Sequence, residues 1–138
     1  MDIKKYKLLI VDDESTIIEL LGDYFDQLGF SVETTDNPLN ALKIVENGGI
    51  KIVLTDIKMP KMNGIELLEK IKEVNGLVQV IIMTGYGSLE NTVKCLEQGA
   101  NDYILKPFKD MDEIRNIVQL TIDKIARWES AITNIYVR

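Results

Sequence analysis

The stretch LLIVDDESTIIELLGDYFDQLG, residues 8–29, contains one complete strand-and-helix unit. Its first four residues, Leu8 to Val11, form a continuous apolar run, which is typical of a strand covered on both faces. After the acidic pair Asp12-Asp13, apolar residues recur three and four positions apart, as on one face of a helix. Gly29 then stands where helices commonly end. The stretch therefore predicts a β-strand, a polar loop and an α-helix in that order.

The same unit recurs along the rest of the chain. Further strands are predicted at Phe30–Thr35, Ile50–Thr55, Val78–Met83 and Tyr103–Leu105. Helix starts are predicted at Asn37-Pro38, Asn63, Ser88 and Asp110, since Asn, Ser and Asp are favoured N-cap residues and Pro is favoured at the first helical position. This alternation predicts an α/β fold with five parallel strands, right-handed crossovers and helices on both faces of the sheet.

Composition and charge exclude several classes of function. The 138 residues fit one domain, and the net charge of −6 disfavours nonspecific binding to nucleic acid or to an anionic membrane. No segment has the ~20 apolar residues of a membrane span, and the N-terminal apolar run is too short for a signal peptide. The single cysteine, Cys95, excludes an internal disulfide. Together these features lead us to expect a cytoplasmic protein. Without histidine, the chain has no histidine base, metal ligand or phosphohistidine of its own.

Polar side chains follow four of the predicted strands. Asp12 and Asp13 follow the first strand and Asp56 the third. Thr84 follows the fourth strand and Lys106 the fifth. Because the carboxyl ends of parallel strands meet at one edge of a sheet, we expect these side chains to share one pocket.

Three carboxylates in one pocket repel one another, so their negative charge must be neutralised. Two unit charges ~4 Å apart repel by roughly 4 kcal/mol at an effective dielectric constant near 20, so a cation or an ammonium is expected among them. Helix capping is the simpler alternative for Asp12 and Asp13, but it explains Asp56 poorly, because a loop follows that residue. Mg²⁺ fits, since it prefers hard oxygen ligands and keeps waters that a phosphate can replace.

Lys106 and Thr84 complete the chemistry of a phosphate site. The ammonium of Lys106 can neutralise the acids and then hold a phosphate oxygen, and the hydroxyl of Thr84 can donate to a phosphoryl group. The simpler alternatives are a solvated surface charge for Lys106 and strand-end turn chemistry for Thr84.

Four segments, LLIVDDES, VLTDIKMPKMNG, VIIMTGYGS and GANDYILKPF, together resemble the receiver domain of two-component response regulators. The resemblance covers Lys7 to about Ala126, and the ordered set is more specific than any one segment. It implies a doubly wound, flavodoxin-like sheet with strand order 2-1-3-4-5. It also implies that Asp56 is the phosphoacceptor, which takes a phosphoryl group from the phosphohistidine of a sensor histidine kinase or from a phosphotransfer protein.

The resemblance also implies a metal site and a phosphate-binding residue. Asp12 and Asp13 match the acids that hold Mg²⁺ together with Asp56 and the backbone carbonyl of Lys58. Lys106 matches the phosphate-binding lysine, and its peptide bond to the following proline is expected to be cis.

Two further pairs of residues carry implied roles. Thr84 and Tyr103 match a switch pair, in which Thr84 moves toward the acyl phosphate and Tyr103 turns inward behind it. Lys58 and Tyr86 occupy the positions that modulate the rate at which water removes the phosphoryl group. Since both are bulky, we hypothesise a phosphorylated lifetime longer than that of the fast-cycling chemotaxis type.

The C-terminal segment carries a heptad stripe of mostly apolar residues. Its members are Ile114, Val118, Thr121, Ile125, Trp128, Ile132 and Ile135. We expect residues 1–127 to form the receiver domain and residues 128–138 to extend the last helix or form a tail, with the helix favoured. Such an extension would dimerise or lead to an output module, so a homodimer and a downstream output domain or protein both stay open.

The predicted function is a phosphorylation-controlled signalling switch and not a classical enzyme, because the chain would catalyse only its own aspartyl phosphorylation and slow dephosphorylation. A pseudo-receiver that binds partners without accepting phosphate is the main alternative. An aspartate-nucleophile phosphatase usually needs a second Asp where Lys58 stands. In a flavodoxin the first loop must cradle a phosphate, which the acidic pair Asp12-Asp13 would repel.

Overall fold

The computed structural model describes residues 2–85 and 89–137 of the chain. Its five parallel strands form one sheet in the order β2-β1-β3-β4-β5, which confirms the predicted fold and strand order. The strands are β1 (Lys7–Val11), β2 (Val32–Thr35), β3 (Ile50–Asp56), β4 (Gln79–Thr84) and β5 (Asp102–Leu105).

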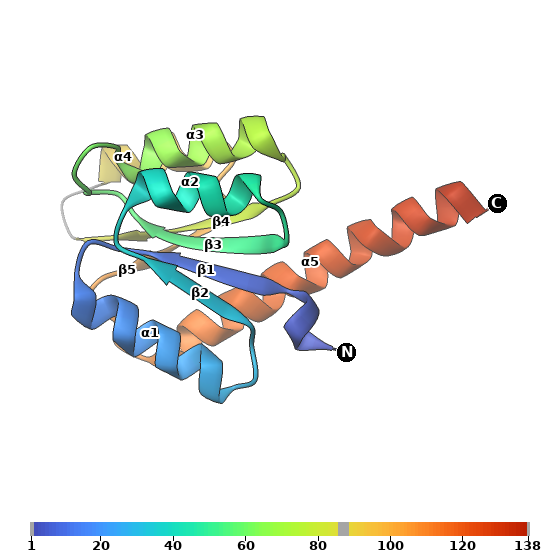
Figure 1. Cartoon of the computed structure of the whole chain (residues 1–138), viewed down its shortest axis with the longest axis horizontal. Coiled ribbons are helices and arrows are strands. Elements are labelled where there is room, and N and C mark those ends of the chain that lie inside the picture. Colours follow the sequence, from blue (N-terminus) through green and yellow to red (C-terminus); the bar gives the residue numbers. More distant parts are fainter. Residues whose placement is uncertain (1, 86–88, 138) are drawn as a thin grey trace.

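Helices cover both faces of the sheet (Figure 1). They are α1 (Ser15–Gln27), α2 (Pro38–Glu46), α3 (Gly64–Val74), α4 (Leu89–Glu97) and α5 (Met111–Val137), preceded by the short 3-10 helix η1 (Ile3–Lys5). Successive residues of β1 point to opposite faces, so Leu8 belongs to the core cluster with residues of α1 and α5, while Leu9 belongs to the cluster with residues of α2 and α3. Each continuous apolar strand therefore contributes side chains to two hydrophobic cores, one on each face of the sheet.

Local hydrogen bonds explain where the elements begin. The side chains of Asn37 and Asn63 accept from backbone N–H groups in the first turns of α2 and α3, as predicted. β2 begins two residues later than predicted, because the N–H of Phe30 still donates to Phe25 O at 3.1 Å, which keeps Phe30 in the turn that ends α1. β4 similarly begins after Val78, whose N–H donates to Asn75 O at 3.2 Å.

The start of α4 falls at the edge of the described residues. Ser88, its predicted first residue, lies outside them, and the described helix begins at Leu89. The helix ends at Glu97, and Gly99 takes a positive φ of 99° just beyond it, as a helix terminator does.

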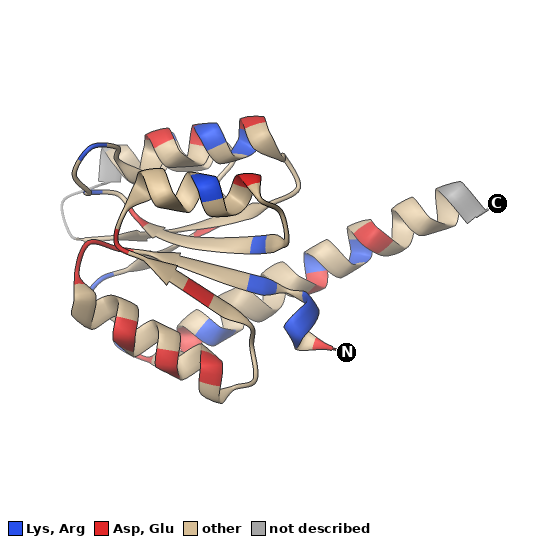
Figure 2. Cartoon of the chain, in the orientation of Figure 1, with Lys and Arg blue, Asp and Glu red and all other residues tan. Residues whose placement is uncertain are grey.

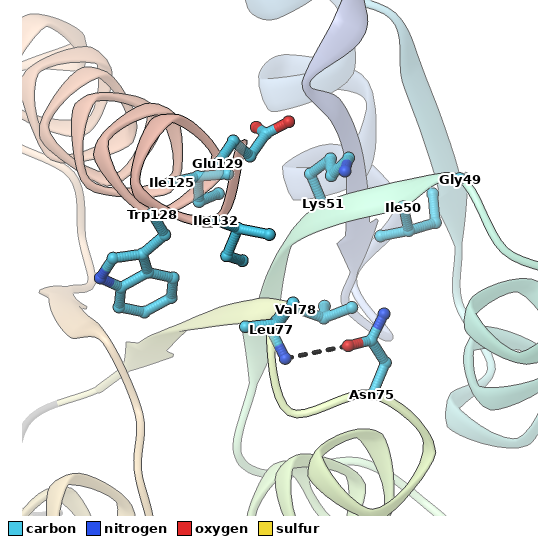
Figure 3. A pocket seen from close by; sticks show the side chains of 10 residues that line it. All are labelled: Gly49, Ile50, Lys51, Asn75, Leu77, Val78, Ile125, Trp128, Glu129 and Ile132. Atoms are coloured by element: carbon cyan, nitrogen blue, oxygen red, sulfur yellow. Dashed lines mark hydrogen bonds between the residues drawn. The ribbon is translucent and has the colours of Figure 1, made fainter. Parts of the chain in front are cut away.

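The last helix continues far past the sheet. α5 is an unbroken helix of 27 residues that ends at Val137 (Figure 1). Its heptad stripe is buried as far as Ile125 and then becomes exposed step by step, to 71% at Ile135. Trp128 still faces the segment that precedes β4 (Figure 3), and Glu129 lies 3.0 Å from the ammonium of Lys5. The helix thus contacts the domain beyond residue 127, while the boundary itself stays a prediction.

Acidic residues and lysines mark different elements of the chain (Figure 2). Acidic residues mark the loop after β1 and the outer face of α1, whereas lysines mark the places where β1 and β3 begin. Within the described ranges, 2–85 and 89–137, no helix is long and apolar enough to span a membrane.

Candidate phosphoacceptor site

The register of the sheet brings the predicted residues together. Val11 of β1 pairs with Thr55 of β3, so the next residues along, Asp12 and Asp56, lie side by side at the carboxyl edge of the sheet. On the other flank of β3, Asp56 pairs with Met83, which places Thr84 one step further along the same edge.

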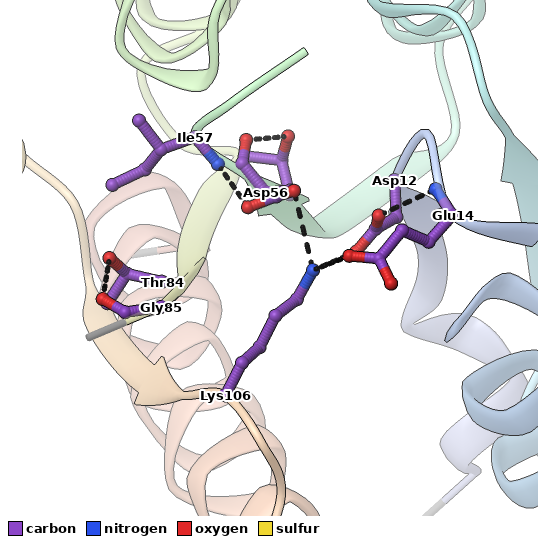
Figure 4. A network of polar contacts seen from close by, with 8 residues as sticks. Asp12, Glu14, Asp56, Ile57, Thr84, Gly85 and Lys106 are labelled. Carbon is purple, nitrogen blue, oxygen red and sulfur yellow. Dashed lines mark hydrogen bonds and ion pairs between the residues drawn. The ribbon is translucent and has the colours of Figure 1, made fainter. Parts of the chain in front are cut away.

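Lys106 bridges the acids of the two strands (Figure 4). Its Nζ donates to Asp12 Oδ2 at 2.6 Å and lies 3.4 Å from Asp56 Oδ2 and 3.6 Å from Glu14 Oε1. The Asp12 side chain is fully buried, and its other oxygen accepts from the N–H of Glu14 at 2.9 Å. Burial alone lowers the pKa of Lys106, but the hydrogen bond and charge of Asp12, with the charges of Asp56 and Glu14, outweigh it and raise that pKa overall. Lys106 is therefore a fixed cation at this site.

The carboxylates offer a donor set that fits a hard divalent cation. One oxygen each from Asp12, Asp13 and Asp56 lies within 4.8 Å of the others. The single ammonium of Lys106 leaves this group of three acids with excess negative charge. Mg²⁺ uses one or two carboxylates and retains water, so the acidic cluster Asp12, Asp13 and Asp56 could bind it. The role of the Lys58 carbonyl stays a prediction.

Asp56 is an ionisable group in a buried position. Its Oδ1 accepts from the N–H of Ile57 at 2.8 Å, and only 8% of the residue is exposed. Burial is the largest influence and raises the pKa of Asp56 above its ordinary value of 3.8. The charge of Asp12 also raises it, and Lys106 and the Ile57 N–H lower it only in part. Ionisation of Asp56 therefore lowers the free energy of unfolding of the chain.

Asp56→Asn should stabilise the fold. The folded chain keeps the proton to higher pH than the unfolded chain, so the ionised carboxylate destabilises the fold at pH values above its raised pKa. We expect the variant to gain free energy of unfolding at pH 7, because it has no carboxylate charge to bury. The gain should shrink as the pH falls through the raised pKa of Asp56 and vanish below 3.8, where both states bind the proton. Urea unfolding from about pH 3 to 8 measures this, with the exposed Asp26→Asn as control, and a variant less stable than the wild type at pH 7 contradicts it.

Thr84 and Tyr103 lie at different depths. Thr84 is 1% exposed, and its hydroxyl donates to Gly85 O at 3.3 Å. It lines a cleft of about 310 Å³ together with Asp13, Asp56, Lys58 and Lys106. Tyr103 does not line this cleft and is 42% exposed, so in this structure its ring is turned outward.

Of the two predicted rate modulators, only one is described. Lys58 is exposed and lines the same cleft as Asp56, and its effect on hydrolysis stays a prediction. Tyr86 lies outside the described residues. The peptide bond between Lys106 and Pro107 is cis, as expected from the resemblance.

Gly64 is a site residue that the sequence reasoning missed. It begins α3, and its N–H donates to Ile57 O at 2.8 Å. A Cβ on Gly64 would overlap Asp56 O and lie 2.9 Å from the Cα of Ile57. The only signal in the sequence is a glycine directly after the Asn63 cap, which does not reveal that α3 begins against the backbone of the candidate phosphoacceptor.

The chain is similar in sequence to known proteins of one family. The family model for the response regulator receiver domain matches residues 8–119. The chain is 42% identical over 113 residues to sporulation initiation phosphotransferase F of Bacillus subtilis, which covers 82% of this chain and 90% of that protein. It is 44% identical over 111 residues to a CpxR homolog of Haemophilus influenzae, over 80% of this chain and 48% of that transcriptional regulatory protein. The chain thus spans less than half of the latter.

Solved structures agree with the sequence comparisons. A receiver domain protein from Clostridium thermocellum superimposes with a TM-score of 0.79 at 30% identity, over 92% of this chain and 98% of that one. A CheY-like receiver domain protein from Methanospirillum hungatei gives 0.81 at 35% identity, over 88% and 97%. With the family model matching most of its length, the chain belongs to the response regulator receiver domains of two-component signal transduction.

Proposed function

We propose that this receiver domain is a phosphoacceptor switch in which Asp56 receives a phosphoryl group from a sensor histidine kinase or a phosphotransfer protein. The observation that carries the proposal is the position of the Asp56 carboxylate. It lines an open cleft, 3.4 Å from the Lys106 ammonium and within reach of the oxygens of Asp12 and Asp13. A carboxylate nucleophile, a fixed cation and a divalent-cation site are the groups that phosphoryl transfer requires.

In the transfer step, a carboxylate oxygen of Asp56 attacks phosphorus, the P–N bond of the donor phosphohistidine breaks, and the imidazole leaves with its electron pair. The N–H of Ile57 donates a hydrogen bond to Asp56 Oδ1 at 2.8 Å, which fixes the orientation of the carboxylate for attack. Asp12, Asp13, Asp56 and the Lys58 carbonyl would hold Mg²⁺, which when bound supplies positive charge to the phosphoryl oxygens.

Lys106 and Thr84 then recognise the product. The ammonium of Lys106 moves from the carboxylates to a phosphoryl oxygen, and the Thr84 hydroxyl exchanges its bond to Gly85 for another phosphoryl oxygen. The movement of Thr84 opens space behind it for the outward Tyr103 ring, which changes the surface of α4, β5 and α5. Partner proteins would bind that surface, where Leu105 and Leu120 are exposed.

Phosphoryl labelling tests the proposed function. Wild-type protein treated with acetyl phosphate and Mg²⁺ should gain the mass of one phosphoryl group, and Asp56→Asn should gain none, because the amide is a poor nucleophile. Asp26→Asn, the same change on the exposed face of α1, should label like the wild type. Labelling of Asp56→Asn, or none in the wild type with either acetyl phosphate or a phosphohistidine donor, rejects the phosphoacceptor role and favours the pseudo-receiver alternative.

Lys58→Asn should shorten the phosphorylated lifetime. The long side chain of Lys58 lines the cleft and restricts the approach of water to phosphorus, so a shorter side chain should speed hydrolysis by up to about tenfold, or ~1.4 kcal/mol in activation free energy. Loss of label measured over time tests this. Lys61→Asn is the matched control, because Lys61 is exposed in the same loop and Asn tolerates its positive φ of 72°. Unchanged or slower loss in Lys58→Asn contradicts the shielding role.

The wider setting follows from the family and from charge. We propose a cytoplasmic location, a kinase or phosphotransfer protein as the donor, and a homodimer or a downstream output domain or protein as the receiver of the signal. The net charge of −6 argues against direct nucleic-acid binding by this domain.

A further inference from the structure

Glu14 is an acidic residue beside the phosphoacceptor site that has no role in the proposed function. It is the N-cap residue of α1, and its backbone carbonyl accepts from the N–H groups of Ile17 and Ile18 at 3.1 and 3.2 Å. Its side chain makes no capping hydrogen bond, although polar side chains at this position commonly do. Instead, Oε1 lies 3.6 Å from the ammonium of Lys106 (Figure 4). The carboxylate is therefore directed toward the site and not toward the first turn of its own helix.

Glu14 lies at the solvent opening of the site. Its side chain is 60% exposed, whereas those of Asp12 and Asp56 are 0% and 11% exposed. It lines the cleft that contains Asp56 and also the adjoining groove that reaches Phe108. Because attack on phosphorus is in line, the leaving group of a donor lies opposite the attacking oxygen of Asp56, on the side of the solvent. Glu14 is thus placed near the leaving group and not near the nucleophile.

The negative charge of Glu14 is only weakly compensated. Glu14 is not one of the three acids whose oxygens lie within 4.8 Å of one another at the candidate metal site. Lys106 lies closer to Asp12 than to Glu14, at 2.6 against 3.6 Å. Lys58 is the other cation that lines the cleft, and in the described part of the chain it forms no ion pair with Glu14. A negative charge therefore stays at the opening when Lys106 turns to a phosphoryl oxygen.

Two classes of phosphoryl donor differ in the charge of their leaving groups. When an oxygen of Asp56 attacks protonated phosphoimidazole, the P–N bond breaks and its electron pair stays on nitrogen. The cationic ring then leaves as neutral imidazole, which keeps the N–H on its other nitrogen. When the same oxygen attacks acetyl phosphate, the P–O bond breaks and the electron pair leaves on acetate, an anion. A carboxylate at the opening accepts from the ring N–H in the first case and repels the leaving group in the second.

We propose that Glu14 is a specificity-determining residue that favours phosphohistidine over carboxylic phosphoryl donors. Its carboxylate would accept a hydrogen bond from the N–H of the donor imidazole and oppose the departure of an anionic leaving group. The inference rests on the proposed phosphoacceptor role of Asp56. It assigns the choice of donor to a residue that belongs neither to the metal site nor to the groups that hold the phosphoryl oxygens.

Labelling with two small donors tests the preference. The full chain is labelled with phosphoimidazole and with acetyl phosphate at saturating Mg²⁺, and the ratio of the two second-order rate constants is measured. Glu14→Gln, which keeps the size of the side chain, should shift this ratio about fivefold toward acetyl phosphate, equivalent to the ~1 kcal/mol between two unit charges ~4 Å apart in water. The phosphoryl group is the same in both donors, so the ratio reports on the leaving group.

Matched variants separate donor choice from general charge and from folding. Glu14→Asp keeps a carboxylate and should shift the ratio less than Glu14→Gln does. Glu19→Gln, the same change on the exposed face of α1, should leave the ratio as in the wild type. The melting temperature of Glu14→Gln should match that of the wild type, because the Glu14 side chain does not cap α1 and exposed ion pairs contribute little to stability.

The outcomes separate this inference from the proposed function. An unchanged ratio in Glu14→Gln overturns the role of Glu14 in donor choice, while labelling of Asp56 by either donor leaves the phosphoacceptor role standing. An equal shift in Glu19→Gln also overturns the role of Glu14, because surface charge in general then sets the ratio. A wild type that is labelled by neither donor overturns both the inference and the proposed function.

Discussion

Gly64→Ala should lower the free energy of unfolding by about 3 kcal/mol and displace the candidate phosphoacceptor. The new Cβ would overlap the carbonyl oxygen of Asp56 and press on the Cα of Ile57 at 2.9 Å. Both contacts are with backbone, so no side chain can rotate away to relieve them. Either α3 or the end of β3 must move, and movement of β3 carries the Asp56 carboxylate away from Lys106.

Urea unfolding and Mg²⁺-dependent labelling with acetyl phosphate measure the two effects of Gly64→Ala. Gly76→Ala is the matched control, because the nearest atom to a Cβ there is Lys72 O at 3.9 Å, an ordinary contact. The control should stay within about 1 kcal/mol of the wild type and label normally. A Gly64→Ala protein as stable and as reactive as Gly76→Ala would show that the contact between α3 and β3 does not position the site.

Lys106→Met should be the most destabilising single change of charge at the site. The substitution keeps most of the side-chain volume but removes the ammonium that lies 2.6 Å from the fully buried Asp12 carboxylate. Removal of one partner from a buried ion pair typically costs 3–5 kcal/mol, because the remaining charge is left uncompensated, so we expect a loss of about 3 kcal/mol at pH 7. The loss should shrink as the pH rises above 10.5 and through the raised pKa of Lys106, because the wild type then gives up the same positive charge.

A double-mutant cycle tests the origin of that loss. Asp12→Asn in the Lys106→Met background should recover part of the stability, because the fully buried Asp12 charge is removed while the Asp56 carboxylate stays without its cation. Lys109→Met, an exposed lysine in the same loop, should change stability by less than about 0.5 kcal/mol. Added Mg²⁺ should stabilise Lys106→Met more than it stabilises the wild type, since the acids have lost their other cation. If Asp12→Asn gives no recovery, the cost arises elsewhere than in the pair.

Much of the fold follows from the sequence because its signals are local. Apolar runs such as Leu8–Val11 and cap residues such as Asn37 and Asn63 act within a few positions, and the structure confirms them. The errors are also local. β2 begins at Val32 and not at Phe30, because a hydrogen bond from Phe30 back to α1 competes with strand pairing.

The sequence also predicts which residues gather at the site, but it does not predict the distances between their side chains. Strand alternation predicts that Asp12, Asp56 and Lys106 share an edge, since all parallel strands end on the same side. It does not predict that Lys106 lies closer to Asp12 than to Asp56, at 2.6 against 3.4 Å. That preference depends on sheet register and on side-chain burial.

The sequence alone therefore determined the elements, their parallel alternation and the edge at which the polar residues gather, because periodicity and capping act over a few residues. Only the tertiary structure decided the contact of Gly64 with Asp56, the burial that raises the Asp56 pKa, and the contact between Glu14 and Lys106. Each of these features joins residues from separate elements, so it depends on how those elements pack against one another. The sequence pattern within a single element does not determine that packing.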